Sequence, residues 1–178
     1  MKKLGISGLI LLVLGLAMAG GCAKKVSSTP AVSPPVATSQ DFGGGMSAEE
    51  LEARRQAEAQ LRAIDTIGAE RIYFAFDKSD LTPESRQVLT EKAALMKEFP
   101  ALEALIEGHC DERGTNEYNM ALGARRAQAA HDYLVQLGVA PARLSLISYG
   151  EERPAVPESN EEAWAKNRRD EFKASAVK

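Results

Sequence analysis

An arginine interrupts the apolar face of a predicted helix. Residues 116–137 carry apolar side chains at helical spacing, and Gly138 marks the end of the segment. Arg126 lies within this apolar stripe, together with Leu122. A guanidinium directed toward a core needs a carboxylate or other acceptors, because partial burial without a partner is costly. The nearest candidate is Asp111, which begins the loop after the preceding predicted strand.

Two interpretations of this arginine compete. In the first, Arg126 forms a structural salt bridge with Asp111 or Asp77. In the second, Asp111 and Arg126 line opposite walls of one pocket that binds a zwitterion. Asp111 would then accept an ammonium group, and Arg126 would bind a carboxylate through two parallel hydrogen bonds. The residues alone leave both interpretations open.

Catalytic and metal chemistry find little support in the sequence. His109 and His131 lie on different predicted elements, and neither has a Cys, His or Asp companion at ligand spacing, so we predict no metal site and no cofactor. On a continuing strand, the side chains of His109 and Cys110 would point to opposite sides. Asp111 and Glu112 next to His109 could serve in acid–base chemistry, but no serine or cysteine nucleophile with an oxyanion motif accompanies them. We therefore do not expect an enzyme.

Strands and helices alternate in the part of the chain that contains these residues. A strand is predicted at 71–76, with Ile72, Phe74 and Phe76 on one face. Further strands are predicted at 102–108, at 144–149 and after residue 168, and helices at about 83–99, 116–137 and 161–166. This alternation predicts an α/β fold, an α+β sandwich in which helices cover one face of a mixed four-stranded sheet with at least one parallel pair. The domain is expected to span residues 68–178.

The N-terminal residues have the features of an export signal. Lys2 and Lys3 precede an apolar run from about residue 9 to residue 19, which is shorter than the ~20 residues of a membrane-spanning helix. The run ends at Ala19-Gly20-Gly21-Cys22, which resembles the bacterial lipobox. We therefore predict a lipoprotein signal peptide at residues 1–21 and a lipid on Cys22. Because Ala23, not aspartate, follows the cysteine, the expected location is the outer membrane, with the domain facing the periplasm.

A linker and a helix are predicted between the anchor and the domain. Residues 22–46 are rich in Pro, Ser, Ala and Gly, and as a flexible tether they would reach roughly 25–30 Å. Residues 47–67 are predicted to hold a spacer helix that begins with a capping box at Ser47 and Glu50 and runs to about residue 64. Its apolar positions are sparse, and a coiled-coil or oligomerisation role is the alternative.

The charge of the chain argues against a nucleic-acid partner. Of the 22 Lys and Arg residues, two would leave with residues 1–21, so 20 basic residues would face 25 acidic ones in the mature protein. No run of five or more basic residues is present. With Cys22 carrying a lipid, Cys110 would have no disulfide partner within the chain.

Several motifs resemble those of a known family. The run from Gly108 to Ala127 resembles the signature of OmpA-like domains. Three further motifs occur in the family's order: Ile72–Ser79, Ser148-Tyr149-Gly150 with Arg153-Pro154, and Asn167-Arg168-Arg169. The resemblance covers residues 70–172. One departure is Asp170, which stands where an apolar residue often follows the two arginines.

The resemblance implies a ligand and a set of binding residues. The ligand would be the meso-diaminopimelate of the peptidoglycan stem peptide, whose side chain ends in an amine and a carboxylate. Asp111 and Arg126 would be the principal pair. The rest of the predicted peptidoglycan-binding set consists of Phe76, Asp77, Asn119, Leu122 and one of Arg168 or Arg169.

The resemblance also implies a cellular role. We expect an outer-membrane lipoprotein that binds peptidoglycan non-covalently, tethers the membrane to the wall and supports envelope integrity and cell division with TolB and the other Tol proteins. TolB would bind a surface that overlaps the pocket. The alternatives are a cell-wall hydrolase and a purely structural envelope assembly protein whose helix at 47–64 pairs with a partner.

Overall fold

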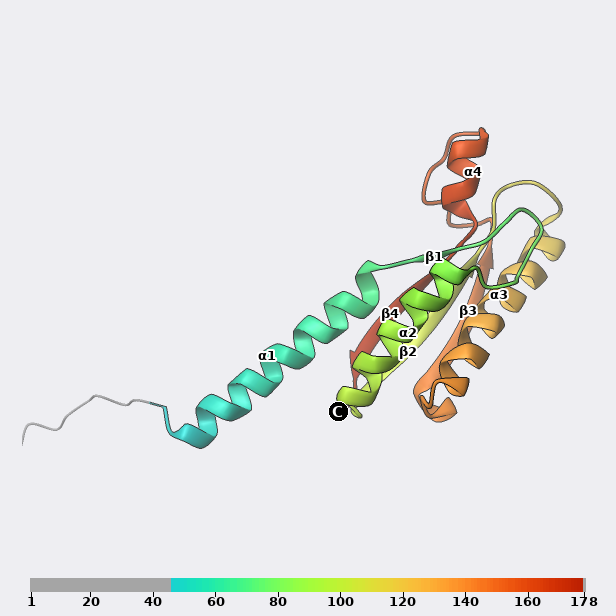
Figure 1. Ribbon diagram of the computed structural model, residues 1–178. Helices are drawn as coiled ribbons and strands as arrows, with labels where there is room; N and C mark the ends of the chain where they lie inside the picture. The colour runs from blue at the N-terminus through green and yellow to red at the C-terminus, as the bar shows by residue number, and fades with distance from the viewer. Residues whose placement is uncertain (1–45, 178) are drawn as a thin grey trace, which may run out of the picture. The chain divides into compact units, whose positions relative to one another are not determined.

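The computed structural model describes residues 46–177, and the predicted signal peptide, Cys22 and all of the linker except Met46 lie outside them. The elements follow the predicted order along the chain (Figure 1). No helix among the described residues has the length and apolar character needed to cross a membrane. The elements are α1 (Ala48–Ala69), β1 (Ile72–Tyr73), α2 (Pro83–Glu98), β2 (Leu102–His109), α3 (Asn116–Gln136), η1 (Pro141–Arg143), β3 (Leu144–Gly150), α4 (Glu161–Asn167) and β4 (Arg169–Ala176).

The four strands form one mixed sheet in the order β1-β4-β2-β3. The pair β2 and β3 is parallel and is joined by α3, whereas β4 is antiparallel to both β1 and β2. The fold class predicted from the sequence is confirmed, including the parallel pair. Because β4 inserts between β1 and β2, the last strand of the chain lies at the centre of the sheet.

The core lies between the sheet and the helices α1, α2 and α3. Its buried members include Ile67 of α1, Leu89 of α2, Ala130 of α3, Ile106 of β2 and Phe172 of β4. Figure 1 shows α2 and α3 side by side over the same face of the sheet. Apolar residues alternate with polar ones along β2 and β4, so the opposite face of the sheet carries mainly polar and charged side chains.

The first helix is longer than predicted and its last turns belong to the domain. The capping box of Ser47 and Glu50 is present at its start. The helix continues to Ala69, and Ala63 and Ile67 are buried in the core. The ammonium group of Lys92 donates to the carbonyls of Ile67 and Glu70 at the C-terminal end of the helix. The predicted boundary at 67/68 therefore falls inside one continuous helix.

The first strand is shorter than predicted, and the position of Phe76 differs. Only Ile72 and Tyr73 pair with β4, and Phe74 is still buried. The chain then turns, with the Lys78 amide donating to the Ala75 carbonyl. Phe76 is 56% exposed and is not a core residue, because the strand has ended before it. The alternation that placed Phe76 with Ile72 and Phe74 was wrong at this last position.

The helix α3 approaches β2 backbone to backbone through two glycines. A Cβ atom on Gly108 would lie 2.1 Å from the carbonyl oxygen of Gly123. A Cβ atom on Gly123 would lie 2.3 Å from the Ser148 hydroxyl and 3.0 Å from the Gly108 carbonyl oxygen. The close approach brings the N-terminal half of α3 against the end of β2, where the loop with Asp111 begins.

This contact predicts a position-specific effect of adding a methyl group. Gly123→Ala should lower the free energy of unfolding by roughly 1–3 kcal/mol, because the new Cβ atom must push helix and strand apart. The measurement is chemical denaturation followed by circular dichroism. Gly68→Ala is the matched control, since its Cβ atom would meet only the Phe172 carbonyl at an ordinary 3.6 Å. Equal stability of the two variants would contradict the close approach.

Candidate functional site

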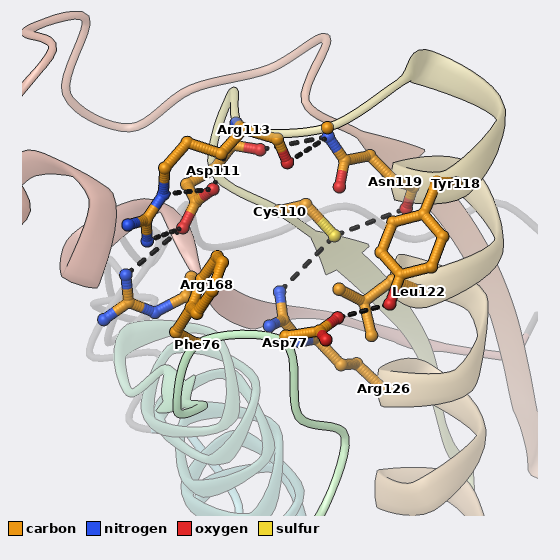
Figure 2. Close-up of a pocket in the computed structure, with 11 residues that line it drawn as sticks. Phe76, Asp77, Cys110, Asp111, Arg113, Tyr118, Asn119, Leu122, Arg126 and Arg168 are labelled. Atoms are coloured by element: carbon orange, nitrogen blue, oxygen red, sulfur yellow. Dashed lines mark hydrogen bonds and ion pairs between the residues drawn. The ribbon is translucent and has the colours of Figure 1, made fainter.

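The residues predicted to bind a ligand surround one small pocket. The cavity has a volume of about 220 Å³, which is too small for a drug-sized molecule and suits a small terminal group. The six residues predicted outright all line it, and of the two alternatives Arg168 lines it whereas Arg169 does not. The full lining consists of Phe76, Asp77, Cys110, Asp111, Arg113, Gly114, Tyr118, Asn119, Leu122, Arg126 and Arg168 (Figure 2).

Asp111 lies between two arginines, neither of which is Arg126. Its carboxylate accepts hydrogen bonds from the Nε and Nη2 of Arg113 at 3.2 and 2.7 Å, and from Nη1 of Arg168 at 3.2 Å. Burial alone would raise the pKa of Asp111, but the hydrogen bonds from Arg113 and Arg168 outweigh it, so its pKa lies below the usual value. Asp111 is therefore ionised at neutral pH.

Arg126 is buried at 0% exposure and is held by backbone carbonyls. Its Nε donates to the Lys78 carbonyl at 2.9 Å, its Nη1 to the His109 carbonyl at 2.8 Å, and its Nη2 to the Ala75 carbonyl at 3.3 Å. Within residues 46–177 it forms no salt bridge, so the predicted pairing with Asp111 or Asp77 is not the arrangement found. Nη2 has a second N–H that these contacts leave unused. The carbonyls explain how a guanidinium fits inside an apolar stripe.

Asp111 and Arg126 lie on opposite sides of the pocket. Figure 2 shows Asp111 with Arg113 and Arg168 on one side, and Arg126 near Leu122 on the other. Both side chains line the same cavity. The geometry therefore has the separated charges that a zwitterionic ligand needs.

Arg113 is a member of the site that the sequence analysis missed. Its guanidinium lies 4.1 Å from the centre of the Phe76 ring and 4.2 Å from that of Trp164, so it contacts two aromatic rings as well as Asp111. It also pairs with Glu161 at the start of α4. Arg113 lies in a loop without periodicity, and only its place two residues after Asp111 could have indicated it.

The two arginines that end α4 and begin β4 point to opposite sides of the sheet. Arg168 donates to the Phe74 carbonyl at 3.1 Å, in addition to its bond to Asp111. Arg169 pairs with Glu171 at 2.7 Å and with the Arg153 carbonyl, on the face away from the pocket. Of the two alternatives that the sequence left open, Arg168 therefore lines the pocket and Arg169 does not, because successive side chains at a strand's start alternate between faces.

The loops that form the pocket are fixed by polar contacts. The Asn119 amide group donates to the carbonyls of Asp111 and Arg113, which holds the loop before α3. The Tyr118 hydroxyl donates to Asp77, and this hydrogen bond raises the pKa of Tyr118. Asp77 has a φ angle of 56°, which lies in the left-handed region and turns the chain at the rim. Asn119 and Asp77 thus shape the pocket as well as lining it.

Cys110 lies beside Arg126 with a neutral thiol. Its sulfur donates to the Asn119 carbonyl and accepts a weak hydrogen bond from Nη1 of Arg126 at 3.4 Å. Burial raises the pKa of the Cys110 thiol to about 11, so the thiolate that a nucleophile needs is scarce at neutral pH. In the described part of the chain this cysteine is free.

Comparisons with known proteins identify the family of this chain. The model of the OmpA family matches residues 73–168, which include every residue that lines the pocket. The chain belongs to the OmpA family. OmpA-family relatives include proteins named peptidoglycan-associated lipoprotein. That of Pseudomonas aeruginosa is 41% identical over 97% of this chain and 99% of its own length, and that of Haemophilus influenzae is 52% identical over 55% of this chain and 64% of its own.

Two solved structures share the fold. The peptidoglycan-associated lipoprotein of Burkholderia pseudomallei is similar with a TM-score of 0.59 and 38% identity, over 60% of this chain and 92% of that one. The C-terminal domain of Helicobacter pylori MotB gives a TM-score of 0.57 at 24% identity, over 61% of this chain and 85% of that one, and supports the fold alone.

Asp170, which directly follows Arg168 and Arg169, lies in the core. It is 0% exposed, and neither of its carboxylate oxygens has a hydrogen-bond partner in the described structure. It stands opposite Gly108 of β2 and Ile72 of β1. Burial raises the pKa of Asp170 well above its usual value, although the charges of Arg126 and Arg169 act in the opposite direction.

This burial predicts a stability that depends on pH. An acid whose pKa is higher in the folded state than in the unfolded state loses stability as pH rises from about 4 through the folded-state pKa. Asp170→Asn should therefore raise the free energy of unfolding at pH 7 by about 1–3 kcal/mol, and the gain should shrink toward pH 4. Urea denaturation over this pH range measures it. A loss of stability at pH 7 would instead mean that an ionised Asp170 supports Arg126.

Proposed function

We propose that this protein is an outer-membrane lipoprotein that binds peptidoglycan non-covalently through the diaminopimelate of the stem peptide. The observation that carries the proposal is that Asp111 and Arg126 line one cavity from opposite sides without pairing with each other. The names of the relatives support peptidoglycan as the ligand, because two peptidoglycan-associated lipoproteins of Pseudomonas species resemble this chain over nearly its full length.

The charges of the pocket suit the free end of diaminopimelate. Its lining carries the guanidiniums of Arg113, Arg126 and Arg168 and the carboxylates of Asp77 and Asp111. This small excess of positive charge favours a ligand carboxylate, which Arg126 would receive through its unused N–H on Nη2. Leu122 would contact the methylene groups of the ligand, since it is the aliphatic side chain on this wall.

The ammonium group of the ligand would bind at Asp111. Arg113 and Arg168 already donate to both oxygens of this carboxylate, so the ammonium must share or displace one of these bonds. Arg113 is the group that would move, because its side chain is partly exposed whereas Arg168 is buried. Phe76 and Trp164 would keep the displaced guanidinium at the rim.

The side chains that line the pocket support ligand binding and not catalysis. Among residues 46–177, Cys110 is the only thiol at the pocket, it is neutral and engaged in hydrogen bonds, and no serine lines the cavity. Modest affinity at each site would suffice, because a lipid on Cys22 and the linker confine the domain beside a polymeric wall and raise the effective ligand concentration.

The Tol system is the proposed partner assembly. TolB would bind a surface that overlaps the pocket rim, so that the wall and TolB exclude one another. Exposed Phe76 and Tyr118 provide apolar contact area at this rim. Such competition would let the protein move between a wall-bound and a TolB-bound location during cell division.

The ligand pocket is tested by binding to purified sacculi. The full-length protein in detergent is incubated with sacculi and the bound fraction is measured after sedimentation. Asp111→Asn should weaken binding about tenfold or more, because it removes the charge opposite the ammonium while keeping the size of the side chain. The double variant Asp111→Ala with Arg126→Ala should abolish binding.

The control for this experiment is Asp132→Asn. Asp132 is an exposed carboxylate near the C-terminal end of α3 and lies outside the pocket. Binding of Asp111→Asn at wild-type strength would refute the pocket. Release of soluble wall fragments by the wild-type protein would favour the hydrolase alternative.

The lipid anchor is tested separately at Cys22. Cys22→Ala should move the protein from the membrane fraction to the soluble periplasmic fraction, because an acyl anchor on Cys22 is the proposed attachment. Cell fractionation and intact-mass measurement show the change. Cys110→Ala serves as the matched control and should stay in the membrane fraction, and a membrane-bound Cys22→Ala protein would contradict lipidation.

A further inference from the structure

The face of the sheet opposite the helices holds a cluster of three ligand-type side chains. Glu107 and His109 of β2 and Glu171 of β4 lie on this face. Side chains alternate along a strand, and the neighbouring Ile106 and Phe172 point to the helices. One ligand atom from each of the three residues lies within 4.8 Å of the other two. Neither Glu107 nor His109 nor Glu171 lines the pocket with Asp111, so the cluster is a separate feature.

His109 is buried there with its polar atoms unsatisfied. Its side chain is 2% exposed, and neither Nδ1 nor Nε2 has a hydrogen-bond partner within the described structure. The ring stacks on Tyr149 at 5.5 Å between centroids, which holds its plane. Buried polar groups are nearly always satisfied, and neither ring nitrogen of His109 is engaged by another protein group, so both are available to a ligand.

The two glutamates face each other across the antiparallel pair of β2 and β4. Glu107 is 7% exposed and is paired in register with Glu171. Like charges directly opposite each other on a sheet are unfavourable. Arg71 and Arg169 both contact the same oxygen of Glu171, Oε1, at 3.1 and 2.7 Å, which leaves Oε2 with only Lys173 at 3.7 Å. A cation between Glu107 and Oε2 of Glu171 would relieve the repulsion.

We propose that Glu107, His109 and Glu171 form a binding site for a divalent transition-metal ion, with Zn²⁺ as the best match. An imidazole nitrogen with two carboxylate oxygens is a donor set that zinc accepts, whereas Mg²⁺ and Ca²⁺ prefer oxygen alone. Ligand atoms around one zinc ion lie about 3.5 Å apart, so the side chains need to close by about 1 Å. Solvent would supply the fourth ligand.

The local charges limit the strength of binding. The guanidiniums of Arg71, Arg153 and Arg169 near the cluster oppose a cation. We therefore expect micromolar and not tighter binding.

The test is a calorimetric titration of the full-length, metal-free protein in detergent with ZnCl₂. The wild-type protein should bind one Zn²⁺ ion, and Glu107→Gln and His109→Gln should each weaken binding at least tenfold. Glu107→Gln keeps the size of the side chain, and circular dichroism confirms that each variant is folded. Titration with Co²⁺ should give a visible absorption band that both substitutions remove.

Two controls exclude other sites. His131→Gln removes the exposed histidine that contacts Asp132, and Glu103→Gln removes a carboxylate on the same strand outside the cluster. Both should bind Zn²⁺ like the wild type. Wild-type binding by Glu107→Gln and His109→Gln, or no binding by the wild-type protein, would overturn the proposal. Binding of the Asp111 variants to sacculi is measured separately. A failure of zinc binding therefore leaves the peptidoglycan proposal unaffected.

Discussion

The site depends on the hydrogen bonds of one buried guanidinium. Arg126 donates to the carbonyls of Ala75 and Lys78 in the loop after β1, and to that of His109 at the end of β2. These segments are far apart in the sequence and form two walls of the pocket. The same side chain thus satisfies its own burial and fixes the distance across the cavity. A residue with both tasks cannot be replaced without affecting fold and binding together.

A second constraint sets where Arg126 can lie. The contact of Gly108 with Gly123 brings α3 close to β2, one turn before Arg126 on the helix. Asn119, one turn before Gly123, reaches the carbonyls of the loop that carries Asp111. Because positions four residues apart share a helix face, one helix presents glycine for packing, arginine for charge and asparagine for the loop.

Periodicity predicted most of the fold, whereas the predicted set of site residues came from the resemblance to the OmpA family. Apolar spacing predicted helices at about 83–99 and 116–137, and the structure has them at 83–98 and 116–136. The family resemblance placed Asp111 and Arg126 in one pocket. Three features could not be predicted from the spacing of apolar residues. The early end of β1 depends on the pairing with β4, the different faces of Arg168 and Arg169 depend on where β4 begins, and Arg113 lies in a loop.

The partner of Arg126 could not be predicted either, because the sequence offered carboxylates and the structure uses backbone carbonyls. The cluster at Glu107, His109 and Glu171 joins residues more than 60 positions apart, and only the register of β2 with β4 brings them together. Local spacing carries no information on such long-range pairing. The sequence therefore predicted the elements better than the contacts between them.

The way α1 enters the core has a mechanical consequence. The helix of 22 residues is about 33 Å long, and its first half makes no buried contact within the described structure. Any load applied on the N-terminal side of residue 46 reaches the sheet through the last turns, where Ile67 packs in the core and Lys92 holds the final carbonyls. A pulling force would therefore strain the contact between α1 and the central strand β4 before the force reached the rim of the pocket.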